Sequence, residues 1–155
     1  MNFSAIEDID APIEDVFQIV SDFESFERSA MRRGAQVQRV DNLSAPAAGM
    51  MWDTRFTMRG RRRELHLLLD VYDVPNRLAL KGTSQGLETS FEVDLMSLSR
   101  TRTRMSVELG LAPSSLSARL LVQSLKLAKT NLTKRFKLRV AEYAKEIEER
   151  CLRSA

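Results

Sequence analysis

The chain has 155 residues, of which 43% are hydrophobic and 29% charged, a composition typical of a globular domain and unlike that of a disordered or membrane-spanning protein. Its net charge is only +3, and its single cysteine, Cys151, excludes an intrachain disulfide. No apolar run approaches the length of a bilayer span and the first residues do not resemble a secretory signal, so we expect residues 1–155 to form a single cytoplasmic domain.

The chain opens with a predicted strand at residues 2–9, followed by two short helices. Pro12 suits the first helical position, because its missing N–H group has no intrahelical partner there. Apolar side chains then recur at the three- and four-residue spacing of one helical face. Asp22 is placed to cap the second helix, which carries Phe23 and Phe26. The apolar residues of the first helix are Ile13, Val16, Phe17 and Val20.

Residues 34–112 alternate between apolar and polar side chains, which is the period of a β-strand. Turn-forming sequences divide this stretch at Gly60-Arg61, Val74-Pro75-Asn76, Gln85-Gly86 and Leu98-Ser99-Arg100. We therefore predict an antiparallel meander of six strands. The expected cross-strand pairs are Phe56 with Leu65, Trp52 with Leu69, Val71 with Leu78, Leu69 with Leu80, Leu80 with Phe91, Val93 with Met105 and, on the polar face, Asp94 with Arg104.

These four turns agree on which face of the sheet is apolar, because a slip of one residue in any of them would exchange the two faces. The polar face carries the only histidine, His66. The predicted inner face consists of Trp52, Phe56, Met58, Leu65, Leu67, Leu69, Val71, Leu78, Leu80, Phe91, Val93, Leu95, Met105, Val107 and Leu109.

The C-terminal part of the chain contains neither proline nor glycine from Ser115 to Arg150 and predicts one long amphipathic helix. Thr130, Asn131 and Thr133 within it are weak helix formers that could allow a bend. Its apolar stripe is formed by Leu121, Leu125, Ala128, Leu132, Phe136, Val140, Tyr143 and Ile147. Leu116, Leu120 and Leu127, with Leu138 further along, lie on the opposite side. This row is compatible with packing under the preceding connection, with a homodimer contact, or with peripheral docking on a membrane.

The stretch DAPIEDVFQIVSDFESF, with Ala11, Pro12, Val16, Phe17 and Asp22, resembles the START-like superfamily of polyketide cyclases, lipid-transfer domains and the birch pollen allergen. The stretch VYDVPNRLAL also resembles the central hairpin of that superfamily. The resemblance implies an α+β helix-grip fold, in which a curved antiparallel sheet wraps around the long C-terminal helix and two short helices follow the first strand. It also implies a hydrophobic cavity between the sheet and the long helix.

With this resemblance, the inner face supplies candidate ligand-binding residues. Small or hydroxylated side chains at Thr54, Gly82, Thr89 and Thr103 would leave room and some polarity there. Arg63 is either an anchor for an anionic headgroup at the cavity mouth or a strand-end side chain that extends to water. The candidates are Trp52, Phe56, Met58, Arg63, Leu67, Leu80, Phe91 and Met105.

The residues supply little for catalysis. One histidine and one cysteine cannot form a Cys/His zinc set, and a Ser-His-Asp triad would have to use His66 on the polar face. We therefore expect no metal, no cofactor and no assigned catalytic residue. Arginine clusters at 32–33, 59–63 and 100–104 lack interleaved aromatic residues, so specific nucleic-acid binding is not expected.

The sequence favours non-catalytic binding or transport of a hydrophobic small molecule such as a lipid, a polyketide or an isoprenoid. The alternative is a polyketide cyclase or dehydratase acting in the same cavity.

Overall fold

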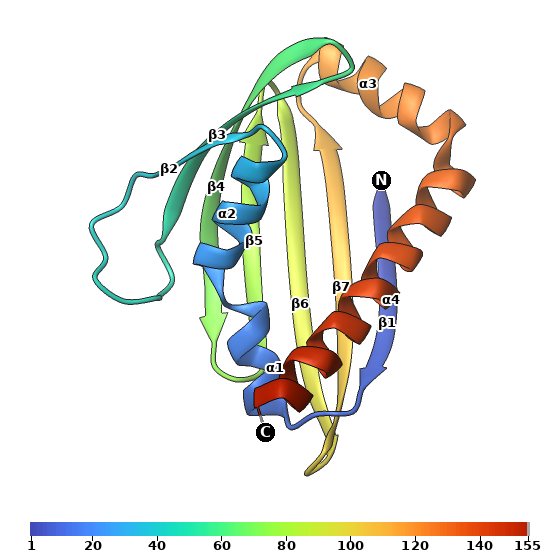
Figure 1. Cartoon of the computed structure of the whole chain (residues 1–155). Coiled ribbons are helices and arrows are strands. Elements are labelled where there is room, and N and C mark those ends of the chain that lie inside the picture. The colour runs from blue at the N-terminus through green and yellow to red at the C-terminus, as the bar shows by residue number, and fades with distance from the viewer. Residues whose placement is uncertain (155) are drawn as a thin grey trace.

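The computed structural model describes residues 1–154 and contains one seven-stranded antiparallel sheet with four helices. The strand order is β1-β7-β6-β5-β4-β3-β2, and the curved sheet holds α4 against its concave side (Figure 1). Helix α2 lies toward the β2 edge, and α1 contacts β6, β7 and the C-terminal part of α4. This is the predicted helix-grip arrangement. No helix among the described residues is long and apolar enough to cross a membrane. The elements are β1 (Asn2–Ile9), α1 (Ile13–Val20), α2 (Phe23–Arg32), β2 (Gln36–Arg39), β3 (Met51–Met58), β4 (Arg61–Asp73), β5 (Arg77–Ser84), β6 (Leu87–Ser99), β7 (Arg102–Pro113), α3 (Leu116–Leu127) and α4 (Lys129–Ser154).

The two short helices begin where the sequence predicts. Helix α1 follows directly after Pro12, and its first turn carries two acidic residues that favour the positive end of the helix dipole. The Asp22 side chain accepts a hydrogen bond of 3.3 Å from the Ser25 N–H group at the start of α2. Val16 and Phe17 are buried, so α1 is anchored in the core.

The β3–β4 hairpin turns at Arg59-Gly60, one residue earlier than predicted. Both residues have positive φ angles, 53° and 73°, as a two-residue type I′ turn requires. Trp52 therefore pairs with Leu67 and Phe56 with Arg63, in place of the predicted partners Leu69 and Leu65. The partners move by two residues, so every side chain keeps its predicted face.

A β-bulge between Leu69 and Val71 changes the inner face of β4. Leu69 pairs with Leu80 as predicted, but beyond the bulge Tyr72, and not Val71, pairs with Leu78. An extra residue in one strand reverses the alternation of all residues after it. The Tyr72 ring accordingly lies 5.6 Å from that of Phe17, and the placement of Val71 on the inner face was wrong.

The β5–β6 turn at Gln85-Gly86 and the pairing of Leu80 with Phe91 are confirmed. In the β6–β7 hairpin, an irregularity between Ser97 and Ser99 moves the partners by two residues. Val93 consequently pairs with Val107, and Met105 with Leu95.

The predicted pair of Asp94 with Arg104 was therefore wrong. Asp94 lies opposite Ser106 and makes an ion pair of 3.3 Å with Arg77. Arg104 pairs with Asp8 at 2.8 Å. Asp94 therefore pairs with a cation on β5 and not on β7, and Arg104 of β7 pairs with a carboxylate on β1.

The C-terminal segment is not one helix. Helix α3 ends at Leu127 and α4 starts at Lys129, with Ala128 between them in a non-helical conformation (φ −105°, ψ 15°). The two helices run in different directions: α3 lies beside β7 and α4 crosses toward α1 (Figure 1). A straight helix could not contact both surfaces, and Thr130 and Asn131 just after the break are weak helix formers.

Thr103 ties β7 to the connection between β1 and α1. It is fully buried, and its Oγ1 donates a hydrogen bond of 2.8 Å to the carbonyl oxygen of Ala11, which is also buried. Its hydroxyl therefore serves the structure and does not add polarity to a cavity.

We predict that Thr103→Val lowers the free energy of unfolding by about 1–3 kcal/mol, because the buried Ala11 carbonyl loses its donor while the side-chain volume is conserved. Urea denaturation measures this. Thr101→Val at the exposed hairpin tip is the control and should be nearly neutral. Equal effects of the two substitutions would contradict the assigned role of the hydrogen bond.

Candidate ligand cavity

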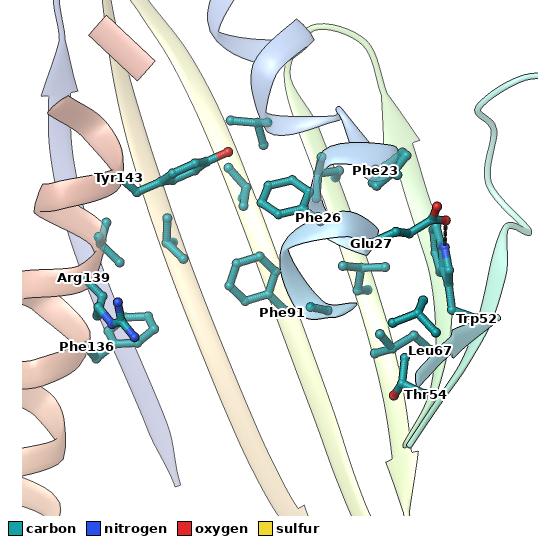
Figure 2. A pocket seen from close by; sticks show the side chains of 18 residues that line it. Phe23, Phe26, Glu27, Trp52, Thr54, Leu67, Phe91, Phe136, Arg139 and Tyr143 are labelled. Carbon is teal, nitrogen blue, oxygen red and sulfur yellow. Dashed lines mark hydrogen bonds between the residues drawn. The ribbon is translucent and has the colours of Figure 1, made fainter. Parts of the chain in front are cut away.

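A cavity of about 480 Å³ lies between the concave face of the sheet and helices α2 and α4 (Figure 2). This volume falls within the range of small-molecule sites, about 300–1,000 Å³. Most of its lining side chains are apolar, and six are aromatic. The lining residues are Val20, Phe23, Phe26, Glu27, Ala30, Val37, Trp52, Thr54, Leu67, Leu78, Leu80, Phe91, Val93, Val107, Phe136, Arg139, Val140 and Tyr143.

The floor of the cavity is formed by the inner faces of the central strands. Leu67, Leu80 and Phe91 lie on β4, β5 and β6, and the pairing of Leu80 with Phe91 brings two of them side by side. Gly82 was expected to leave room here. A Cβ atom at Gly82 would lie 3.1 Å from Leu65 Cδ1 and 3.2 Å from Leu67 Cδ2 and would overlap the Thr89 hydroxyl. Neighbouring side chains therefore already fill that space.

The walls come from two helices. Helix α2 contributes Phe23, Phe26, Glu27 and Ala30, and α4 contributes a set with the same spacing of three, four and seven residues. In Figure 2 the α4 residues and the Glu27–Trp52 pair lie on opposite sides of the cavity. The α4 residues are Phe136, Arg139, Val140 and Tyr143.

Trp52 is fixed from three sides. Its Nε1 donates a hydrogen bond of 2.7 Å to Glu27 Oε1, which joins β3 to α2. The Phe23 ring lies 5.5 Å from the indole, and the Arg39 guanidinium lies 5.8 Å from the ring centroid, within the range of a cation–π contact. These contacts hold the indole ring in one orientation where it lines the cavity.

Arg39 is itself held by Asp41. Its Nε and Nη2 donate hydrogen bonds of 2.7 and 2.6 Å to the two carboxylate oxygens, and the N–H groups of Met51 and Leu43 donate to the same carboxylate. The hydrogen bond from Arg39, followed by that from Met51, lowers the pKa of Asp41 far below its usual value. The loop between β2 and β3 is thus tied to the strand that carries Trp52.

Tyr143 is the exception among the polar groups of the cavity. Its hydroxyl oxygen is buried and has no hydrogen-bond partner among residues 1–154. Burial raises the pKa of the Tyr143 phenol, so the hydroxyl stays protonated and acts as a donor. A buried hydroxyl without a partner destabilises a fold by about 1–3 kcal/mol.

The other polar side chains of the lining are already used or lie at its edge. Thr54 Oγ1 donates a hydrogen bond of 2.9 Å to the carbonyl oxygen of Leu65, and the Glu27 carboxylate accepts from Trp52. Arg139 is exposed on α4. Within the described part of the chain, Tyr143 therefore carries the one buried side-chain hydroxyl of this cavity that has no partner.

Four of the eight candidate residues line the cavity: Trp52, Leu67, Leu80 and Phe91. That they bind a ligand stays a prediction. The other four lie outside the lining.

Met105 is fully buried in the core opposite Leu95. Phe56 and Arg63 face each other nearer the hairpin tip, where Phe56 contributes to a separate pocket beside the end of α2. Arg63 Nε is buried without a partner in the described chain, and Met58 is exposed at the tip.

The sequence interpretation missed the contribution of the helices. Phe23, Phe26, Phe136 and Tyr143 were identified only as members of apolar stripes, and Glu27 and Arg139 were not singled out. A charged residue among the apolar residues of a helix face that packs on a sheet is a signal that could have identified Glu27 and Arg139. Such a side chain is expected either to form an ion pair or hydrogen bond, or to line a binding site.

The only histidine of the sequence, His66, lies outside the cavity. His66 Nδ1 lies 2.6 Å from Asp53 Oδ1 on the polar face, and both side chains are about half exposed. Among the residues that the structure describes, no group of three or more His, Cys, Asp or Glu side chains is arranged to hold a metal ion.

Comparison with solved structures identifies the fold as the START-like, Bet v1-like helix-grip fold. The chain is similar to the Zhui aromatase/cyclase from Streptomyces sp. R1128, with a TM-score of 0.64 and 12% identity over 97% of this chain and 94% of that chain. It is similar to a norcoclaurine synthase from Thalictrum flavum, with a TM-score of 0.63 and 9% identity over 94% of each chain. It is also similar to Ara h 8.0201, with a TM-score of 0.57 and 16% identity over 98% of this chain and 97% of that chain. No protein-family model and no curated protein sequence matches the chain.

We predict that Tyr143 makes stability depend on pH only in the alkaline range. Its pKa is raised in the folded state above the value of about 10 in an unfolded chain. The unfolded state therefore loses the proton first, and stability falls as pH rises above about 10, by up to about 1.4 kcal/mol per pH unit. Below pH 10 the group contributes no pH dependence.

Urea unfolding of the wild type and of Tyr143→Phe at pH 9 and pH 11 measures this dependence. The wild type should lose more stability than the variant between the two pH values. Equal losses would show that the phenol ionises as easily in the folded chain as in the unfolded one.

Proposed function

We propose that this chain is a single ligand-binding domain that binds or transports a hydrophobic small molecule, such as a lipid, a polyketide or an isoprenoid, in the cavity between sheet and helices. The observation that carries the proposal is an apolar space of about 480 Å³ next to a closely packed core. Protein interiors are packed as densely as organic crystals, so an apolar space of this size is unusual unless it has an occupant.

A cyclase or dehydratase acting in the same cavity is the second candidate. It is favoured by the similarity in fold to proteins described as an aromatase/cyclase and a norcoclaurine synthase. The ionisable groups that line the cavity are Glu27, Arg139 and Tyr143, and Glu27 already accepts a hydrogen bond from Trp52. We place binding first because these groups form no paired acid and base. Mass spectrometry of a ligand recovered after incubation distinguishes the two functions, since only an enzyme returns a changed molecule.

We predict that the wild type binds a fluorescent apolar probe, such as N-phenyl-1-naphthylamine or a fluorescent fatty acid. Leu80→Trp and Phe91→Trp should each lower the affinity at least about tenfold, because the larger ring occupies the cavity. The measurement is a fluorescence titration, with circular dichroism to confirm that the variants fold.

Lys81→Trp is the matched control. Lys81 is the next residue of β5, and its exposed side chain lies on the polar face, so the same new ring should leave affinity unchanged. A wild type that binds no apolar probe, or cavity variants that bind as well as Lys81→Trp, would contradict the proposal.

We further propose that the molecule docks on anionic membranes through a surface that we call the basic leucine surface. Leu116, Leu120 and Leu127 are 75%, 60% and 92% exposed, and their spacing puts them within about 40° of one another around α3. Arg59 Nη1 donates a hydrogen bond of 3.4 Å to Ser124 Oγ, which brings the basic tip of the β3–β4 hairpin to the same helix (Figure 1). The surface comprises Leu116, Leu120 and Leu127 with Arg59, Arg61, Arg62, Arg119 and Lys126.

Charge favours a membrane over a second copy of the chain. Residues 109–128, which include α3, contain no Asp or Glu but carry Arg119 and Lys126, and the hairpin tip adds Arg59, Arg61 and Arg62. Two copies of such a surface would repel each other, whereas each Lys or Arg near an anionic leaflet contributes about 1 kcal/mol of attraction. A cytoplasmic location, where membrane leaflets are anionic, is part of the same proposal. Leu138, exposed on α4, is separated from this row by the break at Ala128 and is not part of the surface.

We predict that the wild type floats with liposomes containing anionic phospholipid and not with pure phosphatidylcholine. The double variant Leu120→Glu/Leu127→Glu should lower binding by at least about tenfold, since it replaces inserted apolar groups by charges that the membrane repels. Leu152→Glu is the control, because Leu152 is 73% exposed, comparable to these leucines, but lies at the far end of α4, outside the basic leucine surface.

Light scattering on the same proteins tests the alternative, in which a second copy of the chain covers the basic leucine surface. A wild-type dimer that the double variant converts to a monomer would overturn membrane docking in favour of self-association. A wild type that neither floats nor dimerises would overturn the proposed surface altogether.

A further inference from the structure

The cavity combines an apolar lining with one hydrogen-bond donor that nothing in the described chain satisfies. In Figure 2 the Tyr143 side chain extends from α4 toward the interior, with its oxygen directed at the side where Phe26 lies. The two rings are 6.2 Å apart and tilted. The hydroxyl therefore lies on the side of the cavity where Phe26 is found, and the charges of Asp22, Glu146 and Arg150 are near enough to act on its pKa.

Neither the protein nor water is a good partner for this hydroxyl. Thr54 and Glu27, the other polar side chains of the interior, are bonded to Leu65 and Trp52. A bound water needs two to four polar partners; among the lining residues this part of the cavity offers only Tyr143, and the nearby Arg150 and Asp22 side chains bond to each other at 3.5 Å. A ligand atom is the remaining partner.

We infer that the ligand is an uncharged, mainly apolar molecule with one hydrogen-bond acceptor, such as a ketone or ester carbonyl, that receives the Tyr143 hydroxyl. This inference rests on the proposed function and specifies its ligand class. The acceptor is neutral because no nearby cation is free to pair with an anion: Arg139 lies at the exposed edge, and Arg150, whose charge reaches Tyr143, is already paired with Asp22 at 3.5 Å. A carboxylate beside the Phe26 ring would be desolvated without a counter-ion. The phenol acts as donor because burial keeps it protonated.

A matched pair of probes tests the inference. 2-Acetylnaphthalene carries a carbonyl, and 2-ethylnaphthalene has nearly the same shape without one. The wild type should bind the ketone about three- to tenfold more tightly than the hydrocarbon, as expected for one net hydrogen bond in an apolar site. Tyr143→Phe should remove this difference by weakening ketone binding alone.

Tyr72→Phe provides the matched control, because Tyr72 is the other tyrosine of the chain and does not line the cavity. It should leave the preference for the ketone intact. The carbonyl stretching frequency of bound 2-acetylnaphthalene should be lower in the wild type than in Tyr143→Phe, which reports the hydrogen bond directly.

Tyr143→Phe should raise the stability of the ligand-free protein while it lowers the affinity for the ketone. Without ligand, Tyr143→Phe should unfold at a higher urea concentration than the wild type, because it removes a buried hydroxyl that lacks a partner. A tyrosine with a purely structural role would lose stability on the same substitution.

The outcomes separate this inference from the proposed function. Equal binding of both naphthalenes by the wild type and by Tyr143→Phe would overturn the inference and leave apolar binding standing. If neither naphthalene binds the wild type, the proposed function fails together with the inference.

Discussion

The hydrogen bond between Trp52 and Glu27 is the interaction on which the cavity depends. An indole N–H can only donate and an ionised carboxylate can only accept, so the two groups satisfy each other. The bond fastens α2 to β3, while the buried α1 anchors the preceding segment in the core. Helix α2 is thereby held above the sheet, and its apolar side faces a space that it does not fill. Arg39 and Asp41 extend the same constraint into the loop between β2 and β3.

The opposite wall depends on a separate constraint, the break at Ala128. The contact of α3 with β7 and the passage of α4 across the concave face need two directions, which one straight helix cannot provide. Beyond the break, Phe136 packs against Phe3 of β1 with ring centroids 5.8 Å apart. Deeper in the molecule, Val140, Ala144 and Ile147 close the core. The two walls also touch each other, since the Phe26 ring of α2 lies 6.2 Å from that of Tyr143 on α4 and Arg150 pairs with Asp22 at 3.5 Å. The apolar space lies beside these contacts.

The sequence predicted the fold more closely than the details of its pairing. Alternation of apolar and polar residues fixes which face is buried, and errors of two residues in the β3–β4 and β6–β7 hairpins left every face unchanged. The bulge before Val71 could not be predicted, because it arises from how β4 bends against β5 and is not visible in the alternation of apolar and polar residues. The helix break was missed for a similar reason, since no proline or glycine marks it. Its cause is the tertiary surface on which α3 and α4 lie.

The same limit explains why the candidate site was only half predicted. Trp52, Leu67, Leu80 and Phe91 follow from strand alternation alone, whereas the helix residues depend on how α2 and α4 cross the sheet. In natural folds, buried polar groups are nearly always bonded and interiors are nearly always filled. Here a hydroxyl without a partner and an unfilled apolar volume occur at the same place, on the inner side of α4. Each departure by itself lowers stability. Departures from otherwise consistent packing tend to occur at functional sites, so their coincidence at Tyr143 indicates a binding function more strongly than the fold alone does.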